Sequence, residues 1–136
     1  MSQIAVRHEA FDRFRIDIRG HAVVVDQPVP GSTDAGPTPT ELFVASLAAC
    51  AGFYARRFLA RHGIGDGELG VTADFAFSAD HSRIAAVSLR VETPRAIPED
   101  LRPALTRVLE RCTVHESLRN PPSVSFDLIG KSAVSA

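Results

Sequence analysis

The sequence predicts an α+β fold, and three observations support this class. Apolar and polar residues alternate, as in strands, through most of the N-terminal segment up to Val25. A long apolar segment with helix start and stop signals follows, and then come further alternating segments and an amphipathic helix. Because 136 residues are a usual size for one domain, we expect a single domain over residues 1–136.

The N-terminal segment is expected to form three strands. Alternation predicts the first two over Ile4–His8 and 13–19. Gly20 then indicates a hairpin turn, since glycine adopts a positive φ freely, and His21–Val25 returns antiparallel. The next segment, Gln27–Pro39, is rich in Pro, Gly, Ser and Thr, and an ordered loop of this length is often functional.

The main helix has clear signals at both ends. Thr38 and Glu41 form a capping-box pattern, with Pro39 at the first helical position. Gly63 is expected to stop the helix after about His62. A helix of this length spans about 36 Å, which is close to the diameter of a domain of this size.

The middle of this helix, Leu42–Tyr54, is apolar on every face. A membrane span needs roughly 20 apolar residues, so this shorter run predicts a buried helix and no membrane partner. A helix that is apolar all round must be covered on all sides. Because one sheet and one further helix cover it poorly, we expect an intertwined homodimer with the long helices at its centre.

The C-terminal half predicts two more strands, a second helix and a last strand. The two strands are expected over 71–77 and 87–91, where apolar and polar residues alternate. The second helix is expected to start near Pro98, with acidic residues 99–100 in its first turn, where the helix dipole favours them. Alternation over 124–128 predicts the last strand. The apolar residues of the second helix are Leu101, Leu105, Val108, Leu109 and Cys112, and those of the last strand are Val124, Phe126 and Leu128.

Composition and charge exclude several classes of partner. With 15 basic and 16 acidic residues, the net charge of −1 gives no attraction to nucleic acid or to an anionic membrane. Two cysteines cannot form a disulfide-dense secreted scaffold and no signal-peptide pattern is visible, so we expect a cytoplasmic protein with reduced thiols. The sequence has no glycine-rich phosphate loop and no dinucleotide-binding fingerprint, and we expect no cofactor.

The two cysteines allow three interpretations. Cys50 and Cys112 lie at inward helix positions and would serve as small core residues, as free cysteines often do. Cys112 and His115 also have the spacing of metal ligands, but zinc would need two more from scattered residues such as Cys50, His21 and His62. A cysteine–histidine nucleophile pair, as in acyl transfer, would need a third residue to orient the histidine.

Two segments favour a fourth interpretation. Gly36–Cys50 has the sequence GPTPTELFVASLAAC, and Cys112–Leu118 has CTVHESL. They resemble the osmotically inducible protein C and organic hydroperoxide resistance (OsmC/Ohr-like) family. That family has a Pro-x-Glu-Leu-type helix start, an Ala-rich helix ending in Ala-Cys, and a second cysteine about sixty residues later. The order of strands and helices agrees as well, so the resemblance covers nearly the whole chain and implies an OsmC-like fold.

The resemblance implies a thiol peroxidase that reduces organic hydroperoxides in an oxidative stress response. By position, Cys50 is the peroxidatic cysteine, whose thiolate attacks the peroxide and becomes a sulfenic acid. Cys112 is the resolving cysteine, which forms a redox-active disulfide with Cys50 that an external dithiol reduces. We expect Cys112 at the negative end of a helix, where the dipole does not favour a thiolate, and this suits the resolving role.

A cation is expected beside Cys50, since burial alone disfavours a thiolate. In the family it is an arginine from the N-terminal strands, held by a glutamate at the start of the long helix. By position this arginine is Arg13, with Arg15 on the same strand face as a rival, unless both are solvated surface residues. The usual glutamate position, ten residues before Cys50, holds Thr40, and Glu41 follows it. Glu41 therefore orients the arginine, caps the helix or does both. The displacement of the glutamate by one position bears on peroxidase efficiency and substrate choice.

Two other functions fit the same fold. One is a non-catalytic protein that binds a lipid or another small ligand in an apolar pocket beside the long helix. The other is a redox sensor whose disulfide switches an interaction. The presence of both cysteines favours the peroxidase or the sensor, and turnover of an alkyl hydroperoxide with a dithiol separates the peroxidase from both alternatives.

Overall fold

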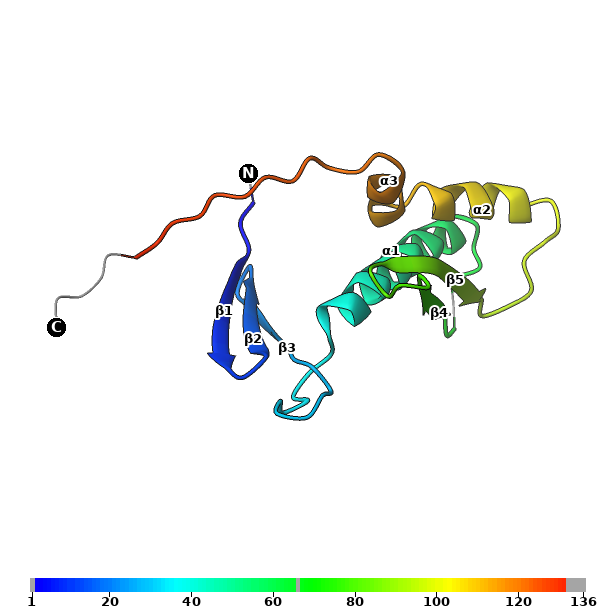
Figure 1. The fold of residues 1–136 in the computed structure, drawn as a ribbon. Helices are drawn as coiled ribbons and strands as arrows, with labels where there is room; N and C mark the ends of the chain where they lie inside the picture. Colours follow the sequence, from blue (N-terminus) through cyan, green and yellow to red (C-terminus); the bar gives the residue numbers. More distant parts are fainter. Residues whose placement is uncertain (1, 66, 132–136) are drawn as a thin grey trace, which may run out of the picture.

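The computed structural model describes residues 2–65 and 67–131. It confirms the α+β class, with strands, a long helix, further strands and helices in the predicted order (Figure 1). The elements are β1 (Ala5–Ala10), β2 (Arg13–Ile18), β3 (His21–Val25), α1 (Pro39–Arg61), β4 (Gly70–Phe77), β5 (Ile84–Glu92), α2 (Arg102–Glu110) and α3 (Thr113–Arg119). Figure 1 shows the three N-terminal strands set apart from a second group that comprises the other elements.

The N-terminal strands form one antiparallel sheet in the order β1-β2-β3. Arg19, with φ 48°, and Gly20, with φ 81°, make the tight turn between β2 and β3. Two consecutive positive φ values suit the right-handed twist of a hairpin, and glycine adopts this conformation without strain. The predicted turn and the predicted third strand are therefore confirmed.

Helix α1 begins and ends where the sequence predicts. Thr38 is the N-cap: its hydroxyl accepts a hydrogen bond from the Glu41 N–H at 3.0 Å, and Glu41 Oε1 accepts one from the Thr38 N–H at 2.8 Å. Pro39 lies in the first turn, where a residue without an N–H leaves no helical hydrogen bond unmade. The helix ends at Arg61, and Gly63 has φ +68° beyond that end.

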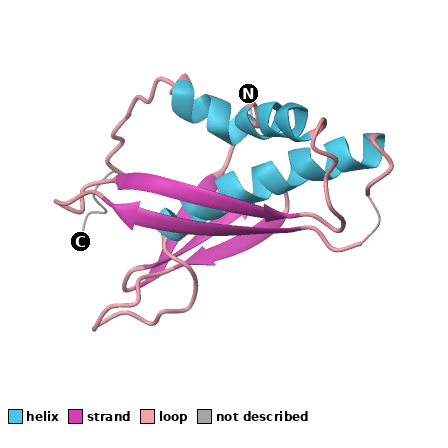
Figure 2. Cartoon of the chain, turned by 90° about the vertical axis from the view of Figure 1, so that its right-hand side faces the viewer, coloured by secondary structure: helices cyan, strands magenta, loops and turns pink. Residues whose placement is uncertain are grey.

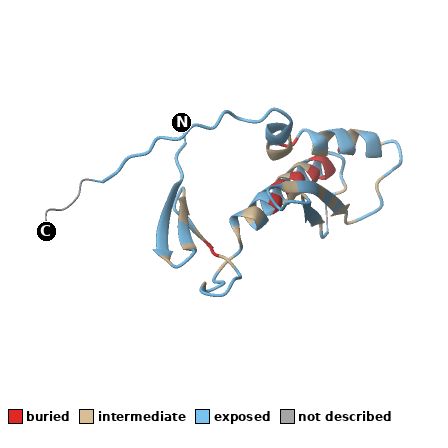
Figure 3. Cartoon of the chain, in the orientation of Figure 1, coloured by how far each residue is buried: buried red, intermediate tan, exposed pale blue. Residues whose placement is uncertain are grey.

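Within one chain, α1 is buried on one face and not all round (Figure 3). It contacts β4, β5, α2 and α3, and Leu105 of α2 completes the core against it. Its buried residues are Val44, Leu47, Ala51, Ala55, Phe58 and Leu59. Phe43 and Phe53, by contrast, are 39% and 53% exposed. The helix is long and apolar enough to cross a membrane by length and composition alone, but here it is the central helix of a folded domain.

Strands β4 and β5 form a second antiparallel sheet, with Val71 opposite Val91 and Phe75 opposite Val87. Figure 2 shows α1 running between this hairpin and the two shorter helices. Alternate residues of β5 thus face the helices. This packing builds the wall of the cavity described below.

The second helix begins later than predicted. Pro98–Leu101 forms a turn, and Arg102–Glu110 forms the helix, so Glu99 and Asp100 precede the helix and do not occupy its first turn. Pro103 explains this start. Because proline has no N–H, it fits the first turn of a helix and not the interior.

The predicted last strand is wrong for the single chain. Residues 121–131 run extended with no strand partner within the described part of the chain (Figure 1). Phe126 is 89% exposed and Leu128 is 93% exposed. Alternation makes a segment suitable for a strand, but a strand also needs a neighbouring sheet edge. Among the described residues, no sheet edge lies against the segment.

Candidate active site

Both cysteines are free thiols, and they lie on elements that contact each other. Cys50 is half-buried at the centre of α1, and Cys112 is completely buried between α2 and α3. The Cys50 thiol lies close enough to contribute to the pKa of Cys112. The fold therefore brings together two thiols that are 62 positions apart in the sequence. Within residues 2–65 and 67–131, no cluster of three His, Cys, Asp or Glu side chains could hold a metal ion.

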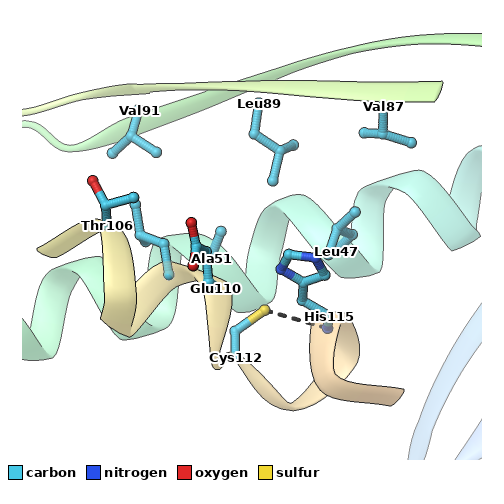
Figure 4. Close-up of a pocket in the computed structure, with 10 residues that line it drawn as sticks. Leu47, Ala51, Val87, Leu89, Val91, Thr106, Glu110, Cys112 and His115 are labelled. Atoms are coloured by element: carbon cyan, nitrogen blue, oxygen red, sulfur yellow. Dashed lines mark hydrogen bonds between the residues drawn. The ribbon is translucent and has the colours of Figure 1, made fainter. Parts of the chain in front are cut away.

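Cys112 caps a third helix that the sequence analysis does not predict. It is the N-cap of α3, and its Sγ accepts a hydrogen bond from the N–H of His115 at 3.4 Å (Figure 4). Cys112 directly follows the C-cap of α2, so the expected position at the negative end of a helix is confirmed, but the same residue also begins α3. Burial raises the pKa of Cys112 and outweighs the N–H groups of His115 and Val114, which lower it, while the Cys50 thiol raises it further.

An apolar cavity of about 260 Å³ opens beside Cys112. Figure 4 shows the Cys112 sulfur and the His115 ring at one side of it, facing the side chains of β5. Its lining residues are Leu47, Ala51, Val87, Leu89, Val91, Thr106, Leu109, Glu110, Cys112 and His115. Cys50 lies outside this wall. The cavity can hold an apolar group next to Cys112.

Arg13 is tied to neighbouring residues of the N-terminal region. Its guanidinium pairs with Glu9 at 3.3 Å and donates to Thr33 Oγ1 at 3.4 Å. Both contacts are partly exposed, so each contributes little to stability by itself. The first contact joins Arg13 to β1, and the second joins it to the loop that precedes α1.

Arg15 is paired with Asp17 at 2.9 Å, and the hydrogen bond from Arg15 to this carboxylate raises the pKa of the guanidinium. Among the contacts of the described residues, neither Arg13 nor Arg15 pairs with Cys50 or Glu41. The Glu41 carboxylate instead completes the helix cap. One chain alone therefore does not assemble the arginine–glutamate pair that the resemblance implies.

Asp26 organises the loop before α1, and sequence reasoning misses it. The side chain is completely buried and accepts hydrogen bonds from the hydroxyls of Ser32 and Thr33 and from the backbone N–H groups of Gln27 and Ala35. The two hydroxyls are the main reason that the pKa of Asp26 lies well below its usual range. The only sequence signal is an acidic residue ahead of a Ser-Thr pair. Because Thr33 also meets Arg13, Asp26 fixes the surroundings of that arginine.

Comparisons with known proteins address the fold and the family. The family model of the OsmC-like protein matches residues 31–127, and a comparison with curated proteins gives no match. The OsmC-like protein of Mycoplasma pneumoniae is 16% identical, with a TM-score of 0.73 over 89% of each chain.

Two further structures of similar fold are named for hydroperoxide resistance. The organic hydroperoxide resistance protein OsmC of Legionella pneumophila is 17% identical, with a TM-score of 0.64 over 88% of this chain and 89% of that one. The organic hydroperoxide resistance protein OhrB of Bacillus subtilis is 19% identical, with a TM-score of 0.60 over 89% of this chain and 92% of that one. Identities this low show a shared fold and leave the activity to be argued from the site. Since the family model covers more than two thirds of the sequence, the chain belongs to the OsmC-like protein family.

Proposed function

We propose that this protein is a cytoplasmic, thiol-dependent peroxidase that reduces organic hydroperoxides. The Cys50 thiolate attacks the peroxide, so that an S–O bond forms, the O–O bond breaks and an alcohol leaves. The Cys112 thiol then attacks the sulfenic acid, which forms the Cys50–Cys112 disulfide and releases water. An external dithiol reduces this disulfide and becomes oxidised in its turn.

The observation that carries the proposal is the meeting of two free thiols at the contact between α1 and α3. Burial raises the pKa of Cys112 and so disfavours its thiolate, which is the form that attacks a peroxide. This supports the assignment of the first attack to Cys50. The names of the structures from Legionella pneumophila and Bacillus subtilis support the same substrate class.

The apolar cavity favours organic hydroperoxides over hydrogen peroxide. Its walls are largely aliphatic, and burying an alkyl group there gains about 0.8 kcal/mol for each CH₂ that leaves water. Hydrogen peroxide has no such group. The same cavity would suit a non-catalytic ligand-binding protein, so the experiment must measure turnover and not binding.

The test is peroxide consumption with excess dithiothreitol, across hydrogen peroxide, cumene hydroperoxide and a lipid hydroperoxide. We expect many turnovers per chain, with the organic substrates at least ten times faster than hydrogen peroxide, since about 1.4 kcal/mol of differential binding gives that factor. Mass spectrometry after mild oxidation is expected to find one Cys50–Cys112 link. Binding without turnover, or sulfinic acid at Cys50 with Cys112 free, would contradict the proposal.

We also propose that the protein is an intertwined homodimer. Large apolar side chains are exposed on α1, on β4 and on the extended C-terminal segment, and exposed apolar surface of this kind indicates a site where proteins associate. Among them are Phe43, Phe53, Phe75, Phe77, Val124, Phe126, Leu128 and Ile129. The C-terminal segment has strand-like alternation, and among the described residues of its own chain no sheet edge pairs with it. A sheet edge of a second copy would pair with the backbone N–H and C=O groups of this segment.

Sedimentation at low micromolar concentration is expected to give a single species of twice the chain mass of 14.6 kDa. Phe126→Asp combined with Leu128→Asp should shift this species toward monomer, because charged side chains do not bury in an apolar interface. Ser123→Asp is the matched control, since it adds charge at an exposed polar position beside the apolar residues. A folded monomer in the unmodified protein would refute the homodimer.

A further inference from the structure

One hydrogen bond joins the two segments that carry the cysteines. Tyr54 lies one helical turn after Cys50 on α1, and Thr113 directly follows Cys112 at the start of α3. The Tyr54 hydroxyl and Thr113 Oγ1 are 3.0 Å apart, and either can donate. The bond thus connects a residue one helical turn from Cys50 with the residue next to Cys112, across the contact between α1 and α3.

The two cysteines differ in how firmly they are held. Cys50 lies in the middle of a 23-residue helix, whereas Cys112 lies in the short junction between two small helices. The Tyr54 side chain is half-buried on α1, and its ring lies edge-on to that of Phe53 with 5.6 Å between the ring centroids. The hydrogen bond to Thr113 therefore ties the junction, and Cys112 with it, to the rigid helix.

We propose that Tyr54 and Thr113 are positioning residues that hold Cys112 within reach of an oxidised Cys50, an inference that rests on the proposed peroxidase function. A disulfide forms only when the two Cα atoms lie within about 7 Å and the Cβ atoms face each other. In the step concerned, the Cys112 sulfur bonds to the Cys50 sulfur, the S–O bond of the sulfenic acid breaks, and the hydroxyl leaves with the thiol proton as water.

The position of Cys112 matters because a second reaction competes with this step. A second peroxide molecule can oxidise the sulfenic acid on Cys50 to sulfinic acid, which thiols do not reverse. Capture by Cys112 must be faster than this oxidation. A junction that moves freely spends less time at bonding distance, so the loss of the hydrogen bond slows capture and leaves the first attack unchanged.

The first experiment measures the thiol–disulfide equilibrium against reduced and oxidised dithiothreitol, which needs no peroxide. Tyr54→Phe and Thr113→Val remove a hydroxyl at nearly constant volume, and Thr113→Ser is the control that keeps it. We expect the equilibrium constant for disulfide formation to fall about fivefold in Tyr54→Phe and Thr113→Val, in line with one net hydrogen bond. The double variant should lose no more than either single one, because both remove the same bond.

The second experiment measures sulfinic acid at Cys50 by mass spectrometry over a range of cumene hydroperoxide concentrations. In Tyr54→Phe and Thr113→Val, half-conversion is expected at a several-fold lower peroxide concentration, with the rate of the first turnover unchanged. Thr113→Ser should behave as the unmodified protein does.

Two outcomes would overturn the inference. One is an unchanged dithiothreitol equilibrium in both hydroxyl-free variants. The other is a lowered unfolding temperature with neither the equilibrium nor the sulfinic fraction altered, which would mean that the bond only supports the fold. If the protein does not react with peroxides at all, the proposed function fails, and the dithiothreitol equilibrium still decides whether these residues position the thiols.

Discussion

Replacement of Cys50 by serine is expected to abolish peroxide reduction, down to the rate of a protein-free control. A serine hydroxyl is almost entirely protonated at neutral pH, so it cannot attack the O–O bond as a thiolate does. Cys112→Ser is expected to keep one round of reduction at close to the original rate and to lose recycling by dithiols. Its thiol acts only after the sulfenic acid has formed.

Stopped-flow measurement of the first turnover separates the two roles. One equivalent of cumene hydroperoxide is mixed with pre-reduced protein, and consumption is followed without added dithiol. Thr113→Ser serves as the control, since it alters the neighbourhood of Cys112 and keeps both thiols. Equal first-turnover rates in the unmodified protein and in Cys50→Ser would reverse the assignment.

Complementation between two inactive variants is the second large expected effect. Cys50→Ala and the double variant Arg13→Ala/Arg15→Ala should each be inactive as homodimers. Refolded together, they are expected to form heterodimers that regain activity at one of their two sites. At that site, Cys50 would come from the chain without the arginines, and the arginines would come from the chain without Cys50.

The geometry of α1 supports this expectation. Glu41 and Cys50 are nine residues apart, which places them about 13 Å apart along the helix axis and on nearly opposite faces. No glutamate side chain bridges that gap, so Glu41 of one chain could approach only the Cys50 of another. Arg13 and Arg15 lie in the N-terminal sheet, which stands apart from the body of the same chain (Figure 1).

The control is mass analysis that confirms heterodimer formation, and single Arg13→Ala and Arg15→Ala variants show which arginine is needed. Confirmed heterodimers without activity would mean that arginine and cysteine belong to one chain or that the arginines do not matter. Recovery that depends on Arg13 alone would also give a role to Asp26, because the loop that it organises holds Thr33 against that arginine.

Local signals predict those parts of the fold that depend on neighbouring residues. The cap at Thr38 follows from a local hydrogen bond, and the stop at Gly63 and the turn at Gly20 follow from the positive φ that glycine adopts. The structure confirms all three. Helix α3 is missed because seven residues are too few to show a helical period. Its cap is also a cysteine, which sequence rules do not count among helix caps.

Features that depend on distant partners could not be predicted in the same way. The alternation in 124–128 is real, but whether it becomes a strand depends on an edge that its own chain does not offer. The buried Asp26 depends on four donors that only the folded loop brings together. The helix positions of the two cysteines follow from periodicity, but their pairing follows only from the family resemblance, because a separation of 62 residues does not show whether two thiols lie close together.

In the proposed mechanism the sulfur of Cys112 is a redox group, and in the structure it is also the cap of α3. The reduced sulfur accepts a hydrogen bond from the N–H of His115, whereas a bond to Cys50 would draw the same sulfur toward α1 and away from that N–H. Each oxidation would therefore weaken the cap, and each reduction would restore it. The oxidation state of the proposed thiol pair would thereby be coupled to the order of a short surface helix. Amide hydrogen exchange at Val114 and His115 would then show a difference in protection between the two forms.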